Sequence, residues 1–537
     1  MRPTDGTTFT QLFSSLAEEY GASMAVLDAD AGASISFRQL NDQAAFLAGG
    51  LQSIGLQRGD RLALFLPNGI DWLILLLAAA RLGVVVVGVN TRYRPDDLAH
   101  VLALSRANAL VVANEFLGID FLAIVSETLS RLPDPPMVIV SPRRNEQWAA
   151  SDFASADLAD LRTGEATGDH ADCDDTLVTF STSGTTGLPK LAMHDHVGTV
   201  AHCEAAGQSC GLGPGDVSLL IVPLCGAFGF TTALASLSAG AGLVISRRFS
   251  PVAAVSLIAQ YQVTHVNGSD DMLLAILEAD ASGGLDLASW RDGVYAEFTN
   301  VGGQVVEIGD AIAGVHLSGA YGSSECLALV ARWPQTCPAE MRARNGGTLV
   351  DDSATVRIVS GDDRRALDVG EVGELQFRGP SVLRGYLNDD SETRTSVTAD
   401  GWFRSGDLGR FDGDDGRTFL YHSRMGDSLR LRGFLTDPAE IEHKLLAHPS
   451  VQATHVVGVS APNGGDTCVA FVLPAEGVSV DETELVAFCA AGLARYKVPE
   501  IVVAVQAFPT VDGPNGVKIR KSELRTRAAE LLGYPLS

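Results

Sequence analysis

The chain has 537 residues, of which 46% are hydrophobic and 19% are charged, and its formal net charge is −26. This length exceeds what one hydrophobic core supports, so we expect two or more domains. The negative charge argues against nucleic-acid binding and against electrostatic docking on anionic membranes, because both need a basic face. The eight cysteines form no C-x-x-C pair, which predicts a reduced, cytoplasmic chain without a zinc or redox motif.

Helix-like and strand-like segments alternate in the first part of the chain. Apolar spacing predicts helices over residues 37–51, 70–82 and 96–105, and strands over residues 61–65 and 84–89. The most apolar run, residues 72–89, contains Arg81 and Gly83, so we interpret it as a buried helix and strand rather than a membrane span. Such alternation predicts a parallel, doubly wound sheet.

The same alternation of helix-like and strand-like segments returns over residues 197–277, and after residue 347 it gives way to short strand-like segments. Short strands separated by Gly and Asp over residues 347–421 predict a small antiparallel barrel or sheet. A mixed segment follows, with expected helices at 438–446, 482–493 and from 522, and strands at 453–459 and 468–473. We therefore predict an α/β fold with a large domain over residues 1–425, made of two doubly wound subdomains and a small β-barrel. A smaller, mobile α+β domain is predicted over residues 426–537.

The segment from Thr182 to Lys190 reads T-S-G-T-T-G-L-P-K and carries the strongest chemical signal in the chain. Gly184 and Gly187 allow the backbone N–H groups to turn toward an anion, and Lys190 adds a positive charge. Hydroxyl donors for phosphate oxygens come from three further residues, Ser183, Thr185 and Thr186. The pattern predicts a triphosphate cradle that is not a Walker A loop. The alternative is a flexible surface turn rich in Ser, Thr and Gly.

This segment resembles the phosphate-loop signature of the adenylate-forming superfamily, which includes acyl-CoA synthetases, peptide-synthetase adenylation domains and beetle luciferases. The pentapeptide from Tyr321 to Glu325, Y-G-S-S-E, is similar to the Y-G-x-S/T-E motif of that family. The resemblance implies that Ser324 contacts the α-phosphate, Glu325 holds Mg²⁺ and Tyr321 lies near the adenine. It also implies two further ATP-binding residues, Gly322 and Ser323.

Two segments further along resemble the ribose-binding and hinge motifs of the same family. Residues 401–409 read G-W-F-R-S-G-D-L-G, which implies that Asp407 accepts hydrogen bonds from both ribose hydroxyls. Residues 423–427 read S-R-M-G-D and resemble the interdomain hinge, so Arg424 is expected to join Asp407 at the ribose. The hinge position itself is Gly426, which departs from the family and widens the accessible backbone range.

The last two motifs assign roles to the smaller domain by resemblance. Residues 431–434, L-R-G-F, are similar to the loop that lines the CoA pantetheine tunnel, which implies roles there for Arg432 and Gly433. Residues 515–521, N-G-V-K-I-R-K, resemble the terminal catalytic-lysine motif, and Lys518 matches that lysine. Its ammonium is expected to offset charge as a carboxylate attacks the α-phosphate. A register slip would make Lys521 the candidate instead.

The expected acyl pocket departs from the family pattern. Related ligases often read P-L-F/Y-H, whereas this chain reads P-L-C-G-A-F, with Cys225 and Gly226 at the gate positions. Gly226 predicts open space near the carboxylate, and Phe228 is the remaining bulky candidate, although a packing role suits it equally. After the strand at residue 265, Asp270 and Asp271 either border the acyl cavity or cap a helix beginning near residue 272.

The resemblance spans nearly the whole chain and implies an ATP-dependent acid:CoA ligase that acts on a small carboxylic acid with ATP, Mg²⁺ and coenzyme A. Acyl-AMP and pyrophosphate form first, and an acyl-CoA thioester and AMP form second. Alternatives are transfer to a carrier-protein thiol, luciferase-like oxidation, and a catalytically silent nucleotide-binding paralogue. Retention of Lys190, Glu325, Asp407 and Lys518 favours an enzyme. The identity of the acid and the formation of a homodimer are left open.

Overall fold

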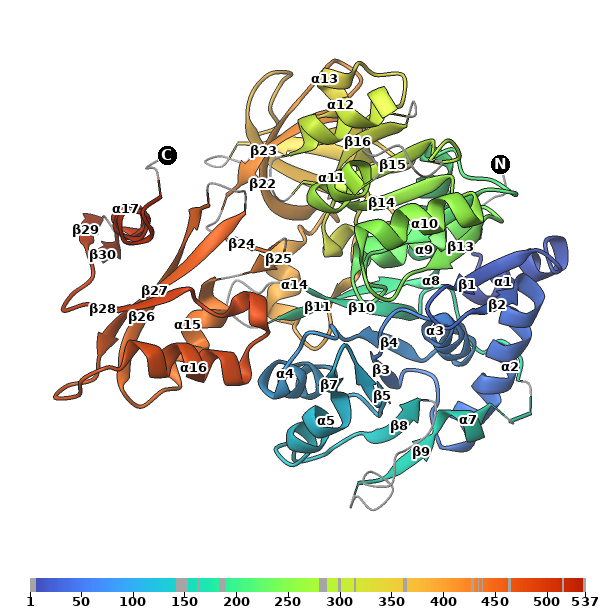
Figure 1. The fold of residues 1–537 in the computed structure, drawn as a ribbon, viewed down its shortest axis with the longest axis horizontal. Helices are drawn as coiled ribbons and strands as arrows, with labels where there is room; N and C mark the ends of the chain where they lie inside the picture. The colour runs from blue at the N-terminus through green and yellow to red at the C-terminus, as the bar shows by residue number, and fades with distance from the viewer. Residues whose placement is uncertain are drawn as a thin grey trace.

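A computed structural model describes most of the chain, and two large β-sheets with helices between and around them form its greater part (Figure 1). A smaller group of strands and helices at the C-terminal end lies to one side of these sheets (Figure 1). The described residues are 6–141, 153–162, 164–165, 167–182, 189–279, 287–297, 301–312, 315–360, 365–425, 429–432, 434–436, 438–461, 465–513 and 516–534.

The first large sheet has eight strands and is parallel from β10 to β9, with antiparallel β11 and β21 at one edge. In spatial order its strands are β21 (Gly385–Tyr386), β11 (Lys190–Asp195), β10 (Thr176–Thr182), β4 (Val85–Gly88), β3 (Arg61–Phe65), β5 (Ala109–Ala113), β8 (Met137–Ser141) and β9 (Ser155–Asp157). A separate two-stranded ribbon lies nearby in sequence, β6 (Glu115–Phe116) and β7 (Ile119–Asp120).

The second large sheet has thirteen strands, and its central strands from β16 to β1 are parallel. The parallel strands are β16 (His316–Tyr321), β15 (Asp292–Ala296), β14 (His265–Ser269), β12 (Val217–Leu220), β13 (Gly242–Ile245) and β1 (Met24–Asp28), and β2 (Ala33–Ser36) adds an antiparallel edge. Six antiparallel strands extend the other edge, β17 (Ala331–Arg332), β18 (Gly346–Leu349), β23 (Thr418–Arg424), β22 (Phe403–Phe411), β20 (Gly373–Arg378) and β19 (Thr355–Val359). These include the short strands predicted over residues 347–421.

Helices form three layers around and between the two sheets. The layer between the sheets contains α1 (Phe9–Glu19), α2 (Phe37–Ser53), α3 (Ile70–Leu82), α8 (His196–Ser209) and α9 (Ala227–Ser238). The outer face of the eight-stranded sheet is covered by α4 (Pro95–Ser105) and α5 (Phe121–Leu129). The outer face of the thirteen-stranded sheet is covered by α10 (Pro251–Tyr261), α11 (Asp270–Ala279) and α12 (Gly302–Ile312). Shorter helices are α7 (Leu158–Leu161), α13 (Ala339–Arg342), α14 (Asp390–Ser396) and the 3₁₀ turn η1 (Ser324–Cys326).

The central helix α3 shows why the layers form. It is apolar on every side, and each of its residues from Trp72 to Leu82 is buried, so it packs against both sheets at once. It ends at Gly83, whose φ of 67° is left-handed and favours glycine. The expectation of a buried helix followed by a buried strand is confirmed. Over the described part of the chain, none of the helices combines the length and apolarity that crossing a bilayer requires.

The C-terminal part begins with the hairpin of β24 (Leu429–Leu431) and β25 (Phe434–Thr436), followed by helix α15 (Pro438–Leu446). A three-stranded sheet follows, formed by β26 (Val451–Ser460), β27 (Asp466–Pro474) and β28 (Ile501–Ala504), and α16 (Glu482–Gly492) and η2 (Arg495–Lys497) lie between its last two strands in sequence. This part of the chain has two hydrophobic clusters of its own. The chain finishes with the hairpin of β29 (Thr510–Gly513) and β30 (Gly516–Ile519) and with α17 (Lys521–Leu532). The predicted α/β class with a large and a smaller domain is confirmed, while the boundary at residue 426 stays a prediction.

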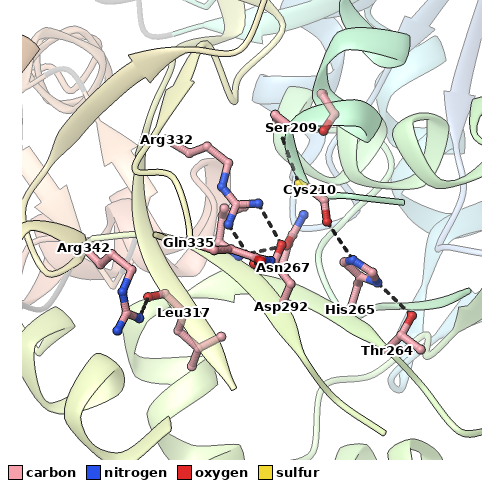
Figure 2. Close-up of polar contacts among 12 residues, drawn as sticks. Ser209, Cys210, Thr264, His265, Asn267, Asp292, Leu317, Arg332, Gln335 and Arg342 are labelled. Atoms are coloured by element: carbon pink, nitrogen blue, oxygen red, sulfur yellow. Dashed lines mark hydrogen bonds and ion pairs between the residues drawn. The ribbon is translucent and has the colours of Figure 1, made fainter. Parts of the chain in front are cut away.

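A buried ion pair joins the parallel and antiparallel halves of the thirteen-stranded sheet (Figure 2). Arg332 on β17 donates two hydrogen bonds of 2.7 Å to the carboxylate of Asp292 on β15. Gln335 donates a third, of 2.8 Å, to the same carboxylate. The side chains of Arg332 and Asp292 are only 3% and 1% exposed, so each charge depends on its partner for stabilisation.

We expect Asp292→Asn to lower the free energy of unfolding by about 3 kcal/mol, because it leaves the Arg332 guanidinium buried without a counter-charge. Urea denaturation followed by tryptophan fluorescence measures the shift in midpoint. The control is Glu371→Gln at the exposed Arg365–Glu371 pair, which should change the midpoint little. Equal midpoints for the two variants would contradict this account of the pair.

Candidate functional site

The predicted phosphate segment connects two antiparallel strands of the eight-stranded sheet. Thr182 ends β10 and Lys190 begins β11, and these two residues are paired in the register of the strands. Residues 183–188 lie outside the described residues, so Ser183, Gly184, Thr185, Thr186 and Gly187 remain predictions. The hydroxyl of Thr182 is buried and has no hydrogen-bond partner among the described residues, which fits a role in holding a bound oxyanion.

Lys190, the last residue of this segment and the first of β11, is buried and forms an ion pair. Its side chain is 7% exposed, and its ammonium forms an ion pair with Glu392 on α14. The same ammonium lies 5.3 Å from the ring centroid of Tyr386 on β21. Part of its positive charge is therefore offset within the protein, and its predicted contribution to phosphate binding is smaller than that of a lysine without a counter-charge.

Glu325 follows β16 in the turn η1, and its carboxylate is positioned by a residue that the motif did not predict. The hydroxyl of Tyr386 donates a hydrogen bond of 3.1 Å to Oε1 of Glu325. Mg²⁺ prefers oxygen ligands, and a single carboxylate holds it where phosphate oxygens and water complete the coordination. Glu325 suits this use. Among the residues that the structure describes, no cluster of three or more His, Cys, Asp or Glu side chains offers an all-protein metal site.

Tyr321 and Asp407, 86 positions apart in sequence, meet in a buried hydrogen bond of 2.6 Å from the phenol to Oδ2. Asp407 lies on β22, where its own N–H donates to Ser405 Oγ at 3.0 Å. The Tyr321 ring stacks on Phe377 with centroids 5.3 Å apart. This contact holds the Asp407 carboxylate at the end of β16, and its expected role at the ribose stays a prediction.

The chain bends through a strained backbone directly after Glu325. Leu327, Ala328 and Leu329 have left-handed φ values of 56°, 52° and 31°, which cost L-residues roughly 1–2 kcal/mol each. Side chains from neighbouring elements hold the carbonyl groups of this segment. His202 Nε2 donates to the carbonyls of Leu327 and Ala328 at 3.2 and 3.1 Å, and Thr231 Oγ1 also donates to Leu327.

His194 on β11 forms the corresponding contact on the other side of the turn. Its Nε2 donates a hydrogen bond of 2.8 Å to the carbonyl of Ser324, which ties the end of the eight-stranded sheet to the turn that follows β16. Burial lowers the pKa of His194 to about 3 and that of His202 to about 4, so both imidazoles are neutral donors at neutral pH. Neither histidine was predicted, because no motif identifies a side chain that binds only backbone carbonyls.

The residues of the predicted acyl gate lie where β12 leads into α9. Gly226 precedes α9, and a Cβ there would contact only the carbonyl oxygen of Pro223, at 3.6 Å, so the position has room for a side chain. Phe228 is partly buried and packs against the core between the sheets. Cys225 is half-buried, and desolvation raises the pKa of its thiol to about 11, so it is protonated at neutral pH.

A small cavity lies beside α9 on the side of Phe228 and has a polar floor. Thr232 Oγ1 accepts a hydrogen bond of 3.2 Å from Asn267, whose own carbonyl accepts one of 3.0 Å from the N–H of Val294. The lining residues are Cys210, Leu212, Ser218, Thr232, Ala235, His265, Asn267 and Leu329. Figure 2 shows His265 held between Thr264 and the carbonyl of Cys210 at this floor.

The two aspartates after β14 form the first turn of α11, which begins at Asp270 rather than near residue 272. Asp270 is fully buried, and its Oδ2 accepts a hydrogen bond of 3.2 Å from the N–H of Val301, next to the start of α12. Asp271 accepts a hydrogen bond from Ser269. Asp270 thus contacts the segment before α12 and Asp271 contacts the hydroxyl of Ser269, and the choice between capping α11 and bordering the acyl cavity stays open.

The predicted residues of the smaller domain are only partly described. Arg424 pairs with Asp407 along the strands β22 and β23, but its side chain, Gly426 and Gly433 lie outside the described part. Arg432 is exposed with a left-handed φ of 50°. Lys518 lies in β30, and the β29–β30 hairpin is at the outer end of the smaller domain, well away from β10 and β16 (Figure 1). This arrangement does not bring Lys518 together with Glu325 and Asp407.

Comparison with known proteins covers almost the entire chain. The model of the AMP-binding enzyme family matches residues 13–387, and that of the AMP-binding enzyme C-terminal domain matches residues 440–512. A feruloyl-CoA synthase from Amycolatopsis sp is 31% identical over 92% of this chain and 94% of its own length. A 4-coumarate–CoA ligase from Oryza sativa subsp. japonica is 29% identical over 96% and 91%. The structure of the amide bond synthetase McbA from Marinactinospora thermotolerans superposes with a TM-score of 0.80 at 27% identity, over 96% of this chain and 99% of that one.

The two neutral histidines predict an acid-sensitive fold. Unfolded histidine has a pKa of about 6.5, so between pH 6.5 and about 4 the unfolded chain binds protons that His202 in the folded chain does not. Stability is therefore lost as the pH falls through this window. His202→Gln keeps a donor for the carbonyls but does not titrate, and we expect its urea midpoint to fall less between pH 6.5 and 4.5 than that of the unsubstituted chain.

The control for this measurement is His316→Gln, the same substitution at a histidine whose side chain is 48% exposed. Parallel pH profiles for His202→Gln and the unsubstituted chain would show that His202 is not the group responsible.

Proposed function

This chain belongs to the AMP-binding enzyme family, the adenylate-forming superfamily that its motifs resemble, and from that premise we propose that it is an ATP-dependent acid:CoA ligase. A substrate carboxylate attacks the α-phosphate of ATP, which gives acyl-AMP and pyrophosphate. The thiolate of CoA then attacks the acyl carbonyl, the thioester forms, and AMP leaves. The observations that carry the proposal are the Tyr321–Asp407 hydrogen bond and the contact between β10, the strand that ends at Thr182, and the turn η1 that holds Glu325.

Each residue has a definite task in the proposed first step. The segment from Thr182 to Lys190 holds the phosphates, and Asp407 receives the ribose hydroxyls while Tyr321 keeps its carboxylate in place. Glu325 would hold Mg²⁺, which when bound neutralises phosphate charge and so favours attack by an anionic carboxylate. Lys518 adds a positive charge near the transferring group when the smaller domain brings it there.

The orientation of the smaller domain fits the second step. The β24–β25 hairpin contacts the large domain, since the Arg92 guanidinium lies 4.5 Å from the ring centroid of Phe434. The segment expected to line the CoA tunnel is therefore at the large domain, and the hairpin carrying Lys518 is away from it. We propose that, after pyrophosphate leaves, rotation of the smaller domain about Gly426 withdraws the hairpin carrying Lys518 and brings the β24–β25 hairpin to the large domain.

The acid is proposed from the open position at Gly226 and from the names of two relatives. Gly226 leaves unfilled the position where related ligases often carry a histidine, and this favours an acid broader than one held behind a histidine gate. The names of the relatives contain ferulate and 4-coumarate, which are aromatic acids with a distal hydroxyl. Hydroxylated aromatic acids are thus the first acids to test.

The test is AMP release by the purified protein with MgATP and CoA across hydroxycinnamates, benzoates, fatty acids of increasing length, and polar or cationic acids. CoA-dependent turnover of one class supports the ligase. A second acceptor deserves inclusion, because the amide bond synthetase McbA resembles this chain over nearly its whole length. AMP release that depends on an amine or a carrier-protein thiol, and not on CoA, would overturn the proposed acceptor, and no acid-dependent pyrophosphate exchange would overturn the enzyme.

The assignment of Lys518 predicts a separation of the two half-reactions. We expect Lys518→Ala to slow acid-dependent ATP–pyrophosphate exchange by about 100-fold or more while thioester formation from supplied acyl-AMP changes less than about threefold. Lys521→Ala is the matched control, since it removes a neighbouring lysine. A large exchange defect in Lys521→Ala with normal exchange in Lys518→Ala would transfer the role to Lys521.

A further inference from the structure

Residues 92–97, between β4 and the first turn of α4, form a docking segment for the smaller domain. Arg92 lies over Phe434 on β25, and the Tyr93 ring centroid is 5.4 Å from Nζ of Lys497 on η2. Asp97 Oδ1 lies 3.3 Å from the same ammonium. One short stretch of the large domain thus contacts two separate elements of the smaller domain.

Asp97 provides the most buried of these contacts. Its Oδ2 accepts a hydrogen bond of 3.1 Å from the backbone N–H of Ala494, in addition to its ion pair with Lys497. Lys497 also pairs with Glu440 on α15, with 2.6 Å between Nζ and Oε2. The three charged side chains are only 4–6% exposed. Burial alone lowers the pKa of Lys497, but Glu440, Tyr496 and Asp97 raise it well above its usual value, so the lysine stays charged.

A second contact beside it requires close approach of two helices. Asp96 pairs with Lys444 on α15 and, at 2.7 Å, with Arg131 of its own domain. A Cβ on Gly492, at the end of α16, would lie only 2.1 Å from Asp96 Oδ2. Glycine therefore allows α16 to reach α4, and the position of the smaller domain is fixed by close packing as well as by charge.

The helix α4 also contacts the phosphate segment. His100 Nε2 donates a hydrogen bond of 2.8 Å to the carbonyl of Pro189, the residue before Lys190. Asp97 and His100 are three positions apart, so they lie on neighbouring parts of the helix surface. One rigid helix thus touches both the docked smaller domain and the end of the segment that is predicted to hold the phosphates.

We propose that Asp97 is a positioning residue for thioester formation, which holds the smaller domain in the orientation seen here. This proposal rests on the proposed ligase function. Glu440 lies in the same domain as Lys497 and stays with it when that domain rotates, whereas Asp97 and its contact to the N–H of Ala494 belong to this orientation alone. Losing Asp97 therefore disfavours the docked orientation without leaving Lys497 unpaired.

The test separates the half-reactions in Asp97→Asn and Lys497→Met. Because Asp97 Oδ2 accepts from both Arg94 N–H, at 3.2 Å, and Ala494 N–H, the asparagine keeps an oxygen for both and removes only the charge that pairs with Lys497, so α4 retains its cap. We expect acid-dependent ATP–pyrophosphate exchange to stay within about twofold of the unsubstituted protein, and CoA-dependent consumption of preformed acyl-AMP to slow by about tenfold or more. Arg131→Gln, which removes a partner of Asp96 without touching the smaller domain, is the control.

A measurement without turnover distinguishes this proposal from the ligase proposal itself. Small-angle X-ray scattering of the ligand-free protein should give a larger radius of gyration for Asp97→Asn than for Arg131→Gln, because the smaller domain is released. Unchanged scattering and unchanged thioester formation would overturn the role of Asp97. An equal loss in both half-reactions would also overturn it, since it would indicate a general structural defect. Absence of acid-dependent exchange in the unsubstituted protein would overturn the ligase proposal instead.

Discussion

The hydrogen bond from His194 to the carbonyl of Ser324 joins the two large sheets at the point where their motifs meet. Two further hydrogen bonds, from the hydroxyl of Tyr386 on β21 and from the backbone N–H of Leu383, reach Glu325 in the same turn. The apolar layer around α3 packs between the two sheets, and these hydrogen bonds hold the turn after β16 against the eight-stranded sheet. These contacts keep Glu325 in a turn that touches β10, the strand ending at Thr182, while Asp407 is bonded to Tyr321 at the end of β16.

The described groups around the site carry little unpaired charge, although the chain as a whole is strongly negative. The molecule carries a net charge of −26, yet the groups next to the site are neutral or paired. His194 and His202 are neutral donors, Lys190 is paired with Glu392, and Glu325 is bound by a neutral phenol. The proposed function therefore assigns much of the attraction for the phosphates to backbone N–H groups and hydroxyls, which the segment from Thr182 to Lys190 is predicted to supply.

The sequence predicted the elements well wherever apolar periodicity was strong. Strand β3 and helices α3 and α15 begin and end at the predicted residues, because a continuous apolar pattern with glycine or proline at its ends leaves one solution. Motif resemblance identified Tyr321 and Asp407, which do meet. It could not identify Tyr386, His194 or the docking at Asp97, because their roles depend on which strands and domains become neighbours, and a single segment does not encode that.

The central claim is that the site forms an acyl adenylate. The most direct test is whether an oxygen atom of the acid's carboxylate is transferred to AMP. The acid that supports turnover would be labelled with ¹⁸O in its carboxylate, and the AMP released in ordinary water would be examined by mass spectrometry. Attack of the carboxylate on the α-phosphate predicts that AMP carries one ¹⁸O from the acid, because the thiolate breaks the bond between the acyl carbon and that oxygen. AMP without the label would contradict an acyl-adenylate intermediate and with it the assignment of the site.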